Sequence, residues 1–407
     1  MQEAINVVRC KLCKQLGHSI EQCPVAKILS KYKPKIKQEI VGSSPPEVFV
    51  GSWNWPYVYY GILAPNEYGN TEIFSMPELW YEENFSIEQI LSYRARMIYS
   101  RKQGNIKKIN DRQLSIMQEL AMAIKHVDVS VLLKKKPTIK TIQDLHWPLI
   151  GNPSPLAKLE IESNPKVPSK TEKLVNDYDA RAREAIIELY QAGIEISNII
   201  KLLSIGLLGV KADRHLVPSR WAVTAVDDTI SKWLLEKVKS YSVIENYQVF
   251  HAEYLGNHYE ILLMPFSWSF EVMEGKLPGC VWNPRCPLFM AIDYEGFNGR
   301  KTYASNVTGA YYANRLAIAE YLARIKRQAA CLVLREVKQS YYAACGVGIL
   351  REACRDALRK KPEIFYSLDE ALNAIARRLE LPAEKFFKHS WLLKKIVKQK
   401  SLKEFFI

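Results

Sequence analysis

The sequence lacks any run of about 18 apolar residues, the length at which a stretch is taken for a membrane-spanning helix. Its first residues, Met1-Gln2-Glu3-Ala4, also lack the basic start and apolar stretch of a secretion signal. These absences predict a cytoplasmic protein with no membrane partner. In such a reducing compartment, five of the eight cysteines are expected to be free core thiols, namely Cys280, Cys286, Cys331, Cys345 and Cys354.

The best-known catalytic motifs are missing as well. There is no GxxxxGK[ST] phosphate loop, no GxGxxG after an expected strand, no HExxH and no GxSxG elbow. The first of these absences argues against a P-loop ATPase. No internal repeat is visible either, so whether the chain is an enzyme stays open at this stage.

The composition that is present is that of a folded and basic protein. The chain has 407 residues, of which 48% are hydrophobic, enough for two or three domains with a large core. The formal net charge is +14, which favours a polyanionic partner such as nucleic acid or a membrane surface. Ordinary surface lysines would give the same balance, so charge alone does not decide between these partners.

The C-terminal residues 399–407 carry a short recognition pattern. Leu402, Phe405 and Phe406 stand at i, i+3 and i+4, so one helical turn places them on the same side, with Gln399 one turn earlier. The pattern resembles a PIP box, the peptide by which DNA repair and replication proteins bind the sliding clamp PCNA. The alternative is a last helix over 391–406 that packs on the protein's own core.

The N-terminus carries a compact set of metal ligands. Cys10, Cys13, His18 and Cys23 place four nitrogen and sulfur ligands within one short segment, as tetrahedral zinc requires. A segment this short has no core of its own, so we expect structural Zn²⁺ to fold it. The spacing resembles a CCHC zinc knuckle, a module that often touches single-stranded nucleic acid. A purely structural zinc site is the alternative.

Other residues are candidates for contact with nucleic acid. The basic candidates are Lys11 and Lys14 beside the zinc ligands, and Arg220, Arg300 and Lys301 in the central part. Aromatic residues are dense over 53–60, where Trp53, Trp55 and three tyrosines lie close together. Such a cluster is either a packed core wall or a platform for stacking bases, and the general tendency of aromatics to be buried favours the core.

Four acidic residues are the candidates for catalysis. Asp227 and Asp228 are expected at a junction between a strand over 221–227 and a helix that begins near Thr229, and Asp293 and Glu295 at the end of a buried strand. Carboxylates that converge on Mg²⁺ would suit phosphodiester cleavage. Capping of the helix by Asp228 is the simpler interpretation of the first pair.

The patterns along the chain predict an α+β protein. Helices are expected over 86–102, 111–126, 180–203, 229–241, 310–338 and most of the chain after 347, and a hairpin around Gly256-Asn257. Five segments are expected: a zinc knuckle over 1–26, a basic linker over 27–47, a mixed central body over 48–345 that has a long loop or internal boundary near 151–170, a basic helical region over 346–398, and the clamp-binding tail over 399–407.

Taken together, the ends and the middle of the chain are similar to the Nre family of archaeal DNA repair proteins. The residues that carry the resemblance are the N-terminal zinc ligands, Phe49-Val50-Gly51 with the Tyr/Trp–Pro turn after it, the stretch over 216–229, and the terminal peptide. The resemblance implies a role in DNA damage repair and PCNA binding through Gln399, Leu402, Phe405 and Phe406. Many members would have four cysteines where this chain has His18, which is itself a good zinc ligand.

The sequence therefore predicts a DNA repair protein that is recruited to DNA by the sliding clamp PCNA, with DNA and other repair enzymes as further partners. One alternative is a metal-dependent nuclease, or another nucleic-acid-modifying enzyme, that uses the four acids. The other is a non-catalytic adaptor that binds single-stranded nucleic acid through the zinc knuckle and the aromatic cluster.

Overall fold

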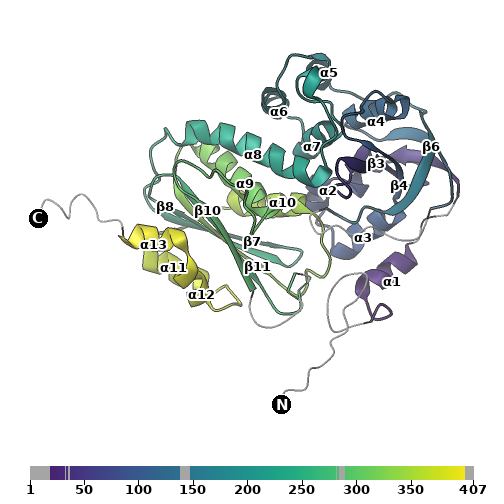
Figure 1. Cartoon of the computed structure of the whole chain (residues 1–407). Helices are drawn as coiled ribbons and strands as arrows, with labels where there is room; N and C mark the ends of the chain where they lie inside the picture. The colour runs from purple at the N-terminus through teal and green to yellow at the C-terminus, as the bar shows by residue number, and fades with distance from the viewer. Residues whose placement is uncertain are drawn as a thin grey trace, which may run out of the picture.

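A computed structural model describes residues 19–32, 34, 37–137, 147–280, 282–283 and 289–398 of the chain. Over these residues the fold is of the α+β class, with two six-stranded sheets and helices packed around them (Figure 1). Three of the predicted zinc ligands, Cys10, Cys13 and His18, lie outside the described residues, and so does the whole of the clamp-binding tail.

The strands fall into two groups along the chain. The first sheet is built from β1 (Glu39–Ser44), β2 (Glu47–Val50), β3 (Tyr57–Ala64), β4 (Ile98–Asn105), β5 (Val127–Leu133) and β6 (Asn152–Ile161). The second sheet is built from β7 (Tyr247–Tyr254), β8 (Asn257–Met264), β9 (Ser269–Lys276), β10 (Phe289–Glu295), β11 (Ala330–Val337) and β12 (Glu363–Phe365).

The helices lie before, between and after these groups of strands. They are α1 (Pro24–Lys31), α2 (Pro77–Glu82), α3 (Ile87–Arg96), α4 (Arg112–Met122), α5 (Ser169–Asn176), α6 (Ala182–Gln191), α7 (Ile196–Ser204), α8 (Ser219–Val238), α9 (Gly309–Ile325), α10 (Val347–Arg359), α11 (Leu368–Ala376), α12 (Ala383–His389) and α13 (Trp391–Lys398). Two short 3₁₀ turns cover Glu72–Phe74 and Lys211–Asp213.

The first sheet has the strand order β1-β5-β6-β4-β3-β2. Its neighbours are antiparallel except for β4 and β6, which run parallel with Ile98 opposite Asn152. Strand β5 alternates between buried and less buried residues, with Val127, Val129 and Val131 fully buried, so one face of the sheet lies on the core.

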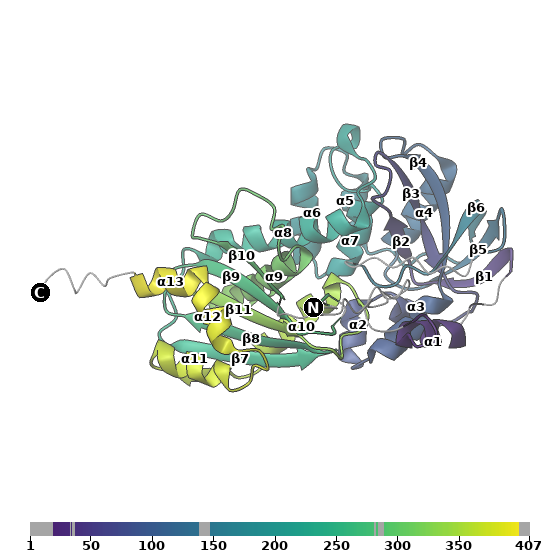
Figure 2. The same ribbon diagram turned by 60° about the horizontal axis from the view of Figure 1, so that its bottom comes forward.

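The second sheet has the strand order β10-β9-β11-β8-β7-β12 and is covered on both faces. Helices α8, α9 and α10 lie on one face, and α11, α12 and α13 lie on the other (Figures 1 and 2). Successive residues of a strand point to opposite faces, so Phe250 belongs to the large core under α8–α10, whereas Val249 packs with Ile375 and Phe386 of the second cluster. Strands β8 and β11 are accordingly buried along their whole length.

Several local predictions are confirmed. Helix α3 begins with a capping box, in which the hydroxyl of Ser86 accepts from the amide of Gln89 while the Gln89 side chain accepts from the amide of Ser86. The hairpin around Gly256-Asn257 is formed by β7 and β8, and Gly256 adopts φ 74°, where glycine is unstrained. The strand expected to end near Asp293 and Glu295 is β10, but it is an edge strand with alternating burial and is not buried along its length.

Other local predictions are wrong, because contacts with residues far away in the sequence determine the secondary structure of these segments. The expected strand over 221–227 and the helix cap at Asp228 are both parts of the single helix α8. The expected helix over 310–338 ends at Ile325 with Lys326 in a left-handed conformation, and β11 follows it. The expected long loop over 151–170 contains β6, an inner strand of the first sheet, and the expected linker over 27–47 contains β1.

Among the helices of the described residues, none combines the length and the apolar composition that crossing a bilayer would require.

Candidate nucleic-acid interface

The start of α8 is attached to the first sheet by a serine. The hydroxyl oxygen of Ser219 accepts a hydrogen bond from the backbone amide of Val50 at 2.9 Å and lies 2.8 Å from the hydroxyl of Ser204. Ser219 is itself fully buried. Because these bonds fix the first turn of α8 against β2, Arg220 and Trp221 are held beside the turn that joins β2 to β3.

That turn and the helix present a group of exposed tryptophans. Trp53, Trp55 and Trp221 are 84%, 55% and 46% exposed. The ring centroids of Trp55 and Trp221 lie 6.4 Å apart, with their planes inclined at 54°. The prediction that the aromatic cluster is core is therefore wrong for Trp53, Trp55 and Tyr57, whereas Tyr60 is buried. Large exposed rings next to one another can stack unpaired bases.

A groove with about 790 Å³ of empty space begins at Trp221 and runs between α8, the loop before α9 and the start of α10. Tyr303, which is 53% exposed, lies on its far side and stacks on Tyr312 with ring centroids 5.3 Å apart. The groove is lined by Arg220, Trp221, Val223, Thr224, Tyr303, Gly309 and Val347. It thus combines aromatic walls with a cation, as a site for a nucleic-acid strand requires.

The predicted basic residues differ in their availability. Arg220 is exposed, and among the described residues no acidic side chain forms an ion pair with it. Lys301 is also exposed. Arg300 is engaged: it donates to Asp293 at 3.0 Å, to the carbonyl oxygen of Tyr294 in β10 and to two carbonyl oxygens of its own loop. Lys11 and Lys14 lie outside the described residues. Arg220 is therefore the candidate best placed to meet phosphate.

The four acids do not gather around one open position. The Asp227 carboxylate binds the guanidinium of Arg351 at 3.1 and 3.0 Å, and burial raises the pKa of Asp227. Asp293 accepts from the backbone amides of Asn306 and Val307 at 2.9 and 2.8 Å, in addition to Arg300.

Asp228 and Glu295 share one arginine. Both carboxylates form ion pairs with Arg315, which is almost fully buried. Glu295 also accepts from the hydroxyl of Tyr311 at 2.8 Å and from the indole of Trp268 at 3.2 Å. Within the described part of the chain, no group of three or more His, Cys, Asp and Glu side chains could hold a metal ion. The observed role of these acids is to bind arginines and backbone amides.

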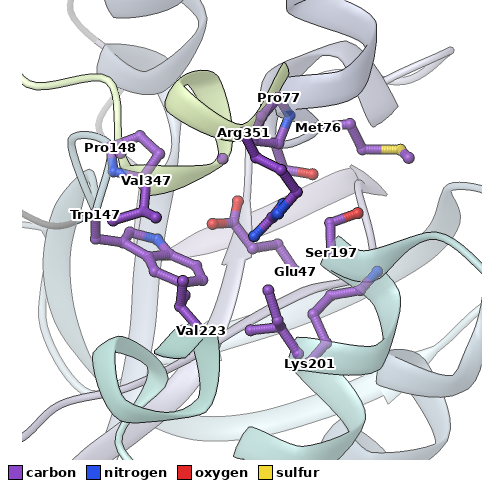
Figure 3. A pocket seen from close by; sticks show the side chains of 14 residues that line it. Glu47, Met76, Pro77, Trp147, Pro148, Ser197, Lys201, Val223, Val347 and Arg351 are labelled. Atoms are coloured by element: carbon purple, nitrogen blue, oxygen red, sulfur yellow. The ribbon is translucent and has the colours of Figure 1, made fainter. Parts of the chain in front are cut away.

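A second, deeper pocket lies next to the groove, and sequence reasoning missed it. It holds about 580 Å³ of empty space, part of which is open to solvent. Val223 and Val347 line both the pocket and the groove. Figure 3 shows Trp147 and Pro148 on one side of the pocket and Ser197 and Lys201 on the opposite side.

Lys201 is the least expected residue of this pocket. It is 8% exposed, and burial lowers its pKa to about 8, with the charges of Glu47, Glu78 and Glu72 partly opposing the shift. Ser197 precedes it by one helical turn, so the two side chains share a face of α7. The only signal in the sequence is a lysine within the apolar run over 196–203, because burial and partners depend on the fold.

Comparison with known proteins identifies the family. A family model described as "Archaeal Nre, N-terminal" matches residues 18–283, and one described as "Archaeal Nre, C-terminal" matches residues 295–405. The "DNA repair protein NreB" of Archaeoglobus fulgidus is 37% identical over 97% of this chain and 99% of that protein. The "DNA repair protein NreA" of the same organism is 35% identical over 92% and 94% of the two chains.

A relative from a second organism gives the same result. The "DNA repair protein NreA" of Haloferax volcanii is 33% identical over 81% of each chain. No solved structure is significantly similar to this chain. The two family models together match most of this chain, and the similarity to the relatives extends over most of its length. This chain therefore belongs to the archaeal Nre family.

Proposed function

We propose that this chain acts in DNA repair and that the groove beside Trp221 binds a single-stranded segment of DNA. The names of three relatives, each called a DNA repair protein, support a role in this process. The observation that carries the binding site is the pair of exposed rings of Trp55 and Trp221, held by Ser219 next to the exposed Arg220. Stacking requires unpaired bases, which is why the proposal specifies single strands.

The charge of the chain supports the same assignment. A net charge of +14 attracts a polyanion, and each phosphate that a cation neutralises releases counterions. Arg220 would meet the backbone of the strand while the tryptophans meet its bases. This division of labour gives binding that depends strongly on salt and weakly on sequence.

We also propose that the C-terminal peptide binds the sliding clamp PCNA through Gln399, Leu402, Phe405 and Phe406. These residues lie outside the described part of the structure, so their spacing in the sequence is what supports the proposal. A peptide of modest affinity would hold the groove near DNA at a high effective concentration. Tethering to the clamp and weak, general strand binding would thus complement each other.

Zinc in the N-terminal segment remains part of the proposal. Of the four ligands, only Cys23 is described; it is fully buried, and α1 begins immediately after it. Cys10, Cys13 and His18 would complete a tetrahedral set with it. The four acids carry no second proposed function, because Asp227, Asp228 and Glu295 are bound to buried arginines and Asp293 to Arg300 and two backbone amides.

The binding site can be tested with a labelled strand. Fluorescence anisotropy would follow the binding of a 20-nucleotide single strand to the full chain between 50 and 300 mM salt, with a duplex of the same sequence for comparison. The proposal predicts tighter binding of the single strand and an affinity that falls steeply with salt. Equal affinity of the wild type and a Trp55→Ala, Trp221→Ala variant for the single strand would overturn it.

A further inference from the structure

The deep pocket beside the groove contains polar groups that the described chain leaves unsatisfied. The hydroxyl oxygen of Ser197 and the indole nitrogen of Trp147 are buried and have no hydrogen-bond partner there. No oxygen of a described residue forms a hydrogen bond or ion pair with the ammonium of Lys201 either. Burying such groups without partners is costly, and a buried charge most of all. Groups of this kind that face a cavity are those that a ligand would satisfy.

Much of the remaining wall is apolar, although Glu47, Ser75 and Arg351 also line the pocket. Met76, Pro77, Ile200 and Val223 contribute to its wall, and Figure 3 shows the indole of Trp147 facing the interior. A flat ring would lie against the Trp147 indole and leave its edges near the polar groups on the opposite side. This combination of an apolar wall and a few polar groups is typical of sites for small heterocycles.

The position of the pocket indicates where such a ring would come from. Val223 of α8 and Val347 of α10 separate the pocket from the groove and line both of them. Trp221 and Val223 both line the groove, so a strand stacked on the Trp221 ring would pass the mouth of the pocket. A base turned out of the strand would then be able to enter it.

We propose that this pocket receives one nucleobase, turned out of the strand that occupies the groove. This inference rests on the proposed function, because the groove must hold a strand for a base to be delivered. The base would stack on Trp147, and its edge would meet Lys201 and Ser197. In this way the ligand would satisfy Lys201 and Ser197, whose polar atoms have no hydrogen-bond partner among the described residues.

The chemistry of the pocket favours bases that carry a carbonyl group. The ammonium of Lys201 can only donate hydrogen bonds, and a base carbonyl oxygen accepts them. The carboxylate of Glu47, which Figure 3 shows at the centre of the pocket, can accept from a ring N–H. Guanine, thymine and uracil present a carbonyl beside a ring N–H, whereas adenine presents neither. Oxo bases are therefore the expected ligands.

The experiment uses the full chain and free deoxynucleosides as probes. Saturation-transfer NMR would compare deoxyguanosine, thymidine and deoxyadenosine at millimolar concentration. We expect clear transfer to deoxyguanosine and thymidine and at least a several-fold weaker signal for deoxyadenosine. Lys201→Met removes the donor and Ser197→Leu fills the pocket, so both variants are expected to lose the signal. Lys173→Met, which changes an exposed lysine of α5, is the matched control and should keep it.

The outcomes separate this inference from the proposed function. Strand binding by the wild type with no nucleoside signal, or a signal that survives in both pocket variants, would overturn the pocket inference and leave the proposed function standing. Nucleoside binding without strand binding would overturn the proposed function and, with it, the strand as the source of the base. Arg220→Ala should lose affinity for the strand and keep the nucleoside signal. Loss of both strand binding and nucleoside binding in this variant would show that the groove and the pocket are not separate sites. Thermal unfolding of each variant would show that it is folded.

Discussion

The indole rings of Trp55 and Trp221 lie 6.4 Å apart, although 166 positions separate the two residues along the chain. Trp55 belongs to the turn between β2 and β3, and Trp221 to the first turn of α8. Ser219 holds the two elements together through the amide of Val50. The exposed pair is thus a product of the tertiary fold, and its exposure is what makes it available to bases.

Replacement of either tryptophan by alanine should weaken the binding of single-stranded DNA. Base stacking on an aromatic ring contributes about 1–3 kcal/mol, so each variant is expected to bind roughly fivefold or more weakly. Anisotropy titrations would measure the effect. The control is Tyr366→Ala, which removes a still more exposed aromatic residue next to β12 and should leave the affinity unchanged. An equal loss in the control would mean that exposed aromatics in general, and not this pair, determine the affinity.

The two arginines near the groove should behave differently. Arg220→Ala is expected to weaken strand binding and to reduce the slope of log affinity against log salt by about 1, since one phosphate contact is lost. Arg300→Ala removes hydrogen bonds to Asp293 and to its own loop, so it should lower the free energy of unfolding instead. Salt titrations and urea denaturation of both variants check this. The reverse pattern would show that Arg300, and not Arg220, meets the phosphate.

Glu295 should matter for stability because it neutralises a buried arginine. Glu295→Ala leaves Arg315 with the partly exposed Asp228 as its remaining ion-pair partner, and we expect a loss of about 3 kcal/mol in the free energy of unfolding. Glu245→Gln changes an exposed acid and serves as the control. The account would be contradicted if the wild type cleaved labelled DNA in the presence of Mg²⁺ and Glu295→Ala lost this activity while its free energy of unfolding stayed unchanged.

Lys201 should make the stability of the protein depend on pH. Burial lowers its pKa from 10.5 to about 8, so the folded state disfavours the charged form that the unfolded chain retains. Below pH 8 the lysine is charged in both states and the full cost of burying it is present; the cost is lost as the pH rises from 8 to 10.5. Lys201→Met should therefore unfold with a free energy roughly 2–3 kcal/mol higher than the wild type at pH 7.

The measurement for this prediction is chemical denaturation of both proteins at pH 7 and at pH 10. The advantage of the variant should shrink steadily between these values, and Lys173→Met should show no such trend. A constant difference between the wild type and Lys201→Met across the range would show that the lysine titrates at its ordinary pKa.

The features that the sequence predicted correctly are those that depend on neighbours in the chain. The capping box of Ser86 and Gln89 and the turn at Gly256 involve residues at most three positions apart. Helix α8 was divided wrongly because Asp227 looks like the end of an element, whereas Arg351, 124 positions away, satisfies it inside the core. The deep pocket was missed for the same reason, since nothing local indicates that Lys201 is buried.

The family resemblance was confirmed, because its motifs extend over nearly the whole chain. The prediction that the aromatic cluster over 53–60 is buried was wrong for its tryptophans. The average tendency of tryptophan to be buried does not determine which individual ring lies at the surface. The zinc ligands and the clamp peptide remain predictions.

The central proposal is that the sliding clamp PCNA brings this protein to DNA. Calorimetric titration of PCNA from the same organism, with the full chain and with a chain that ends at Lys398, tests it most directly. The account predicts micromolar binding by the full chain and none by the shortened chain, and a Phe405→Ala, Phe406→Ala variant should behave like the shortened one while keeping its zinc content. Equal binding by all three proteins, or binding by none, would contradict it.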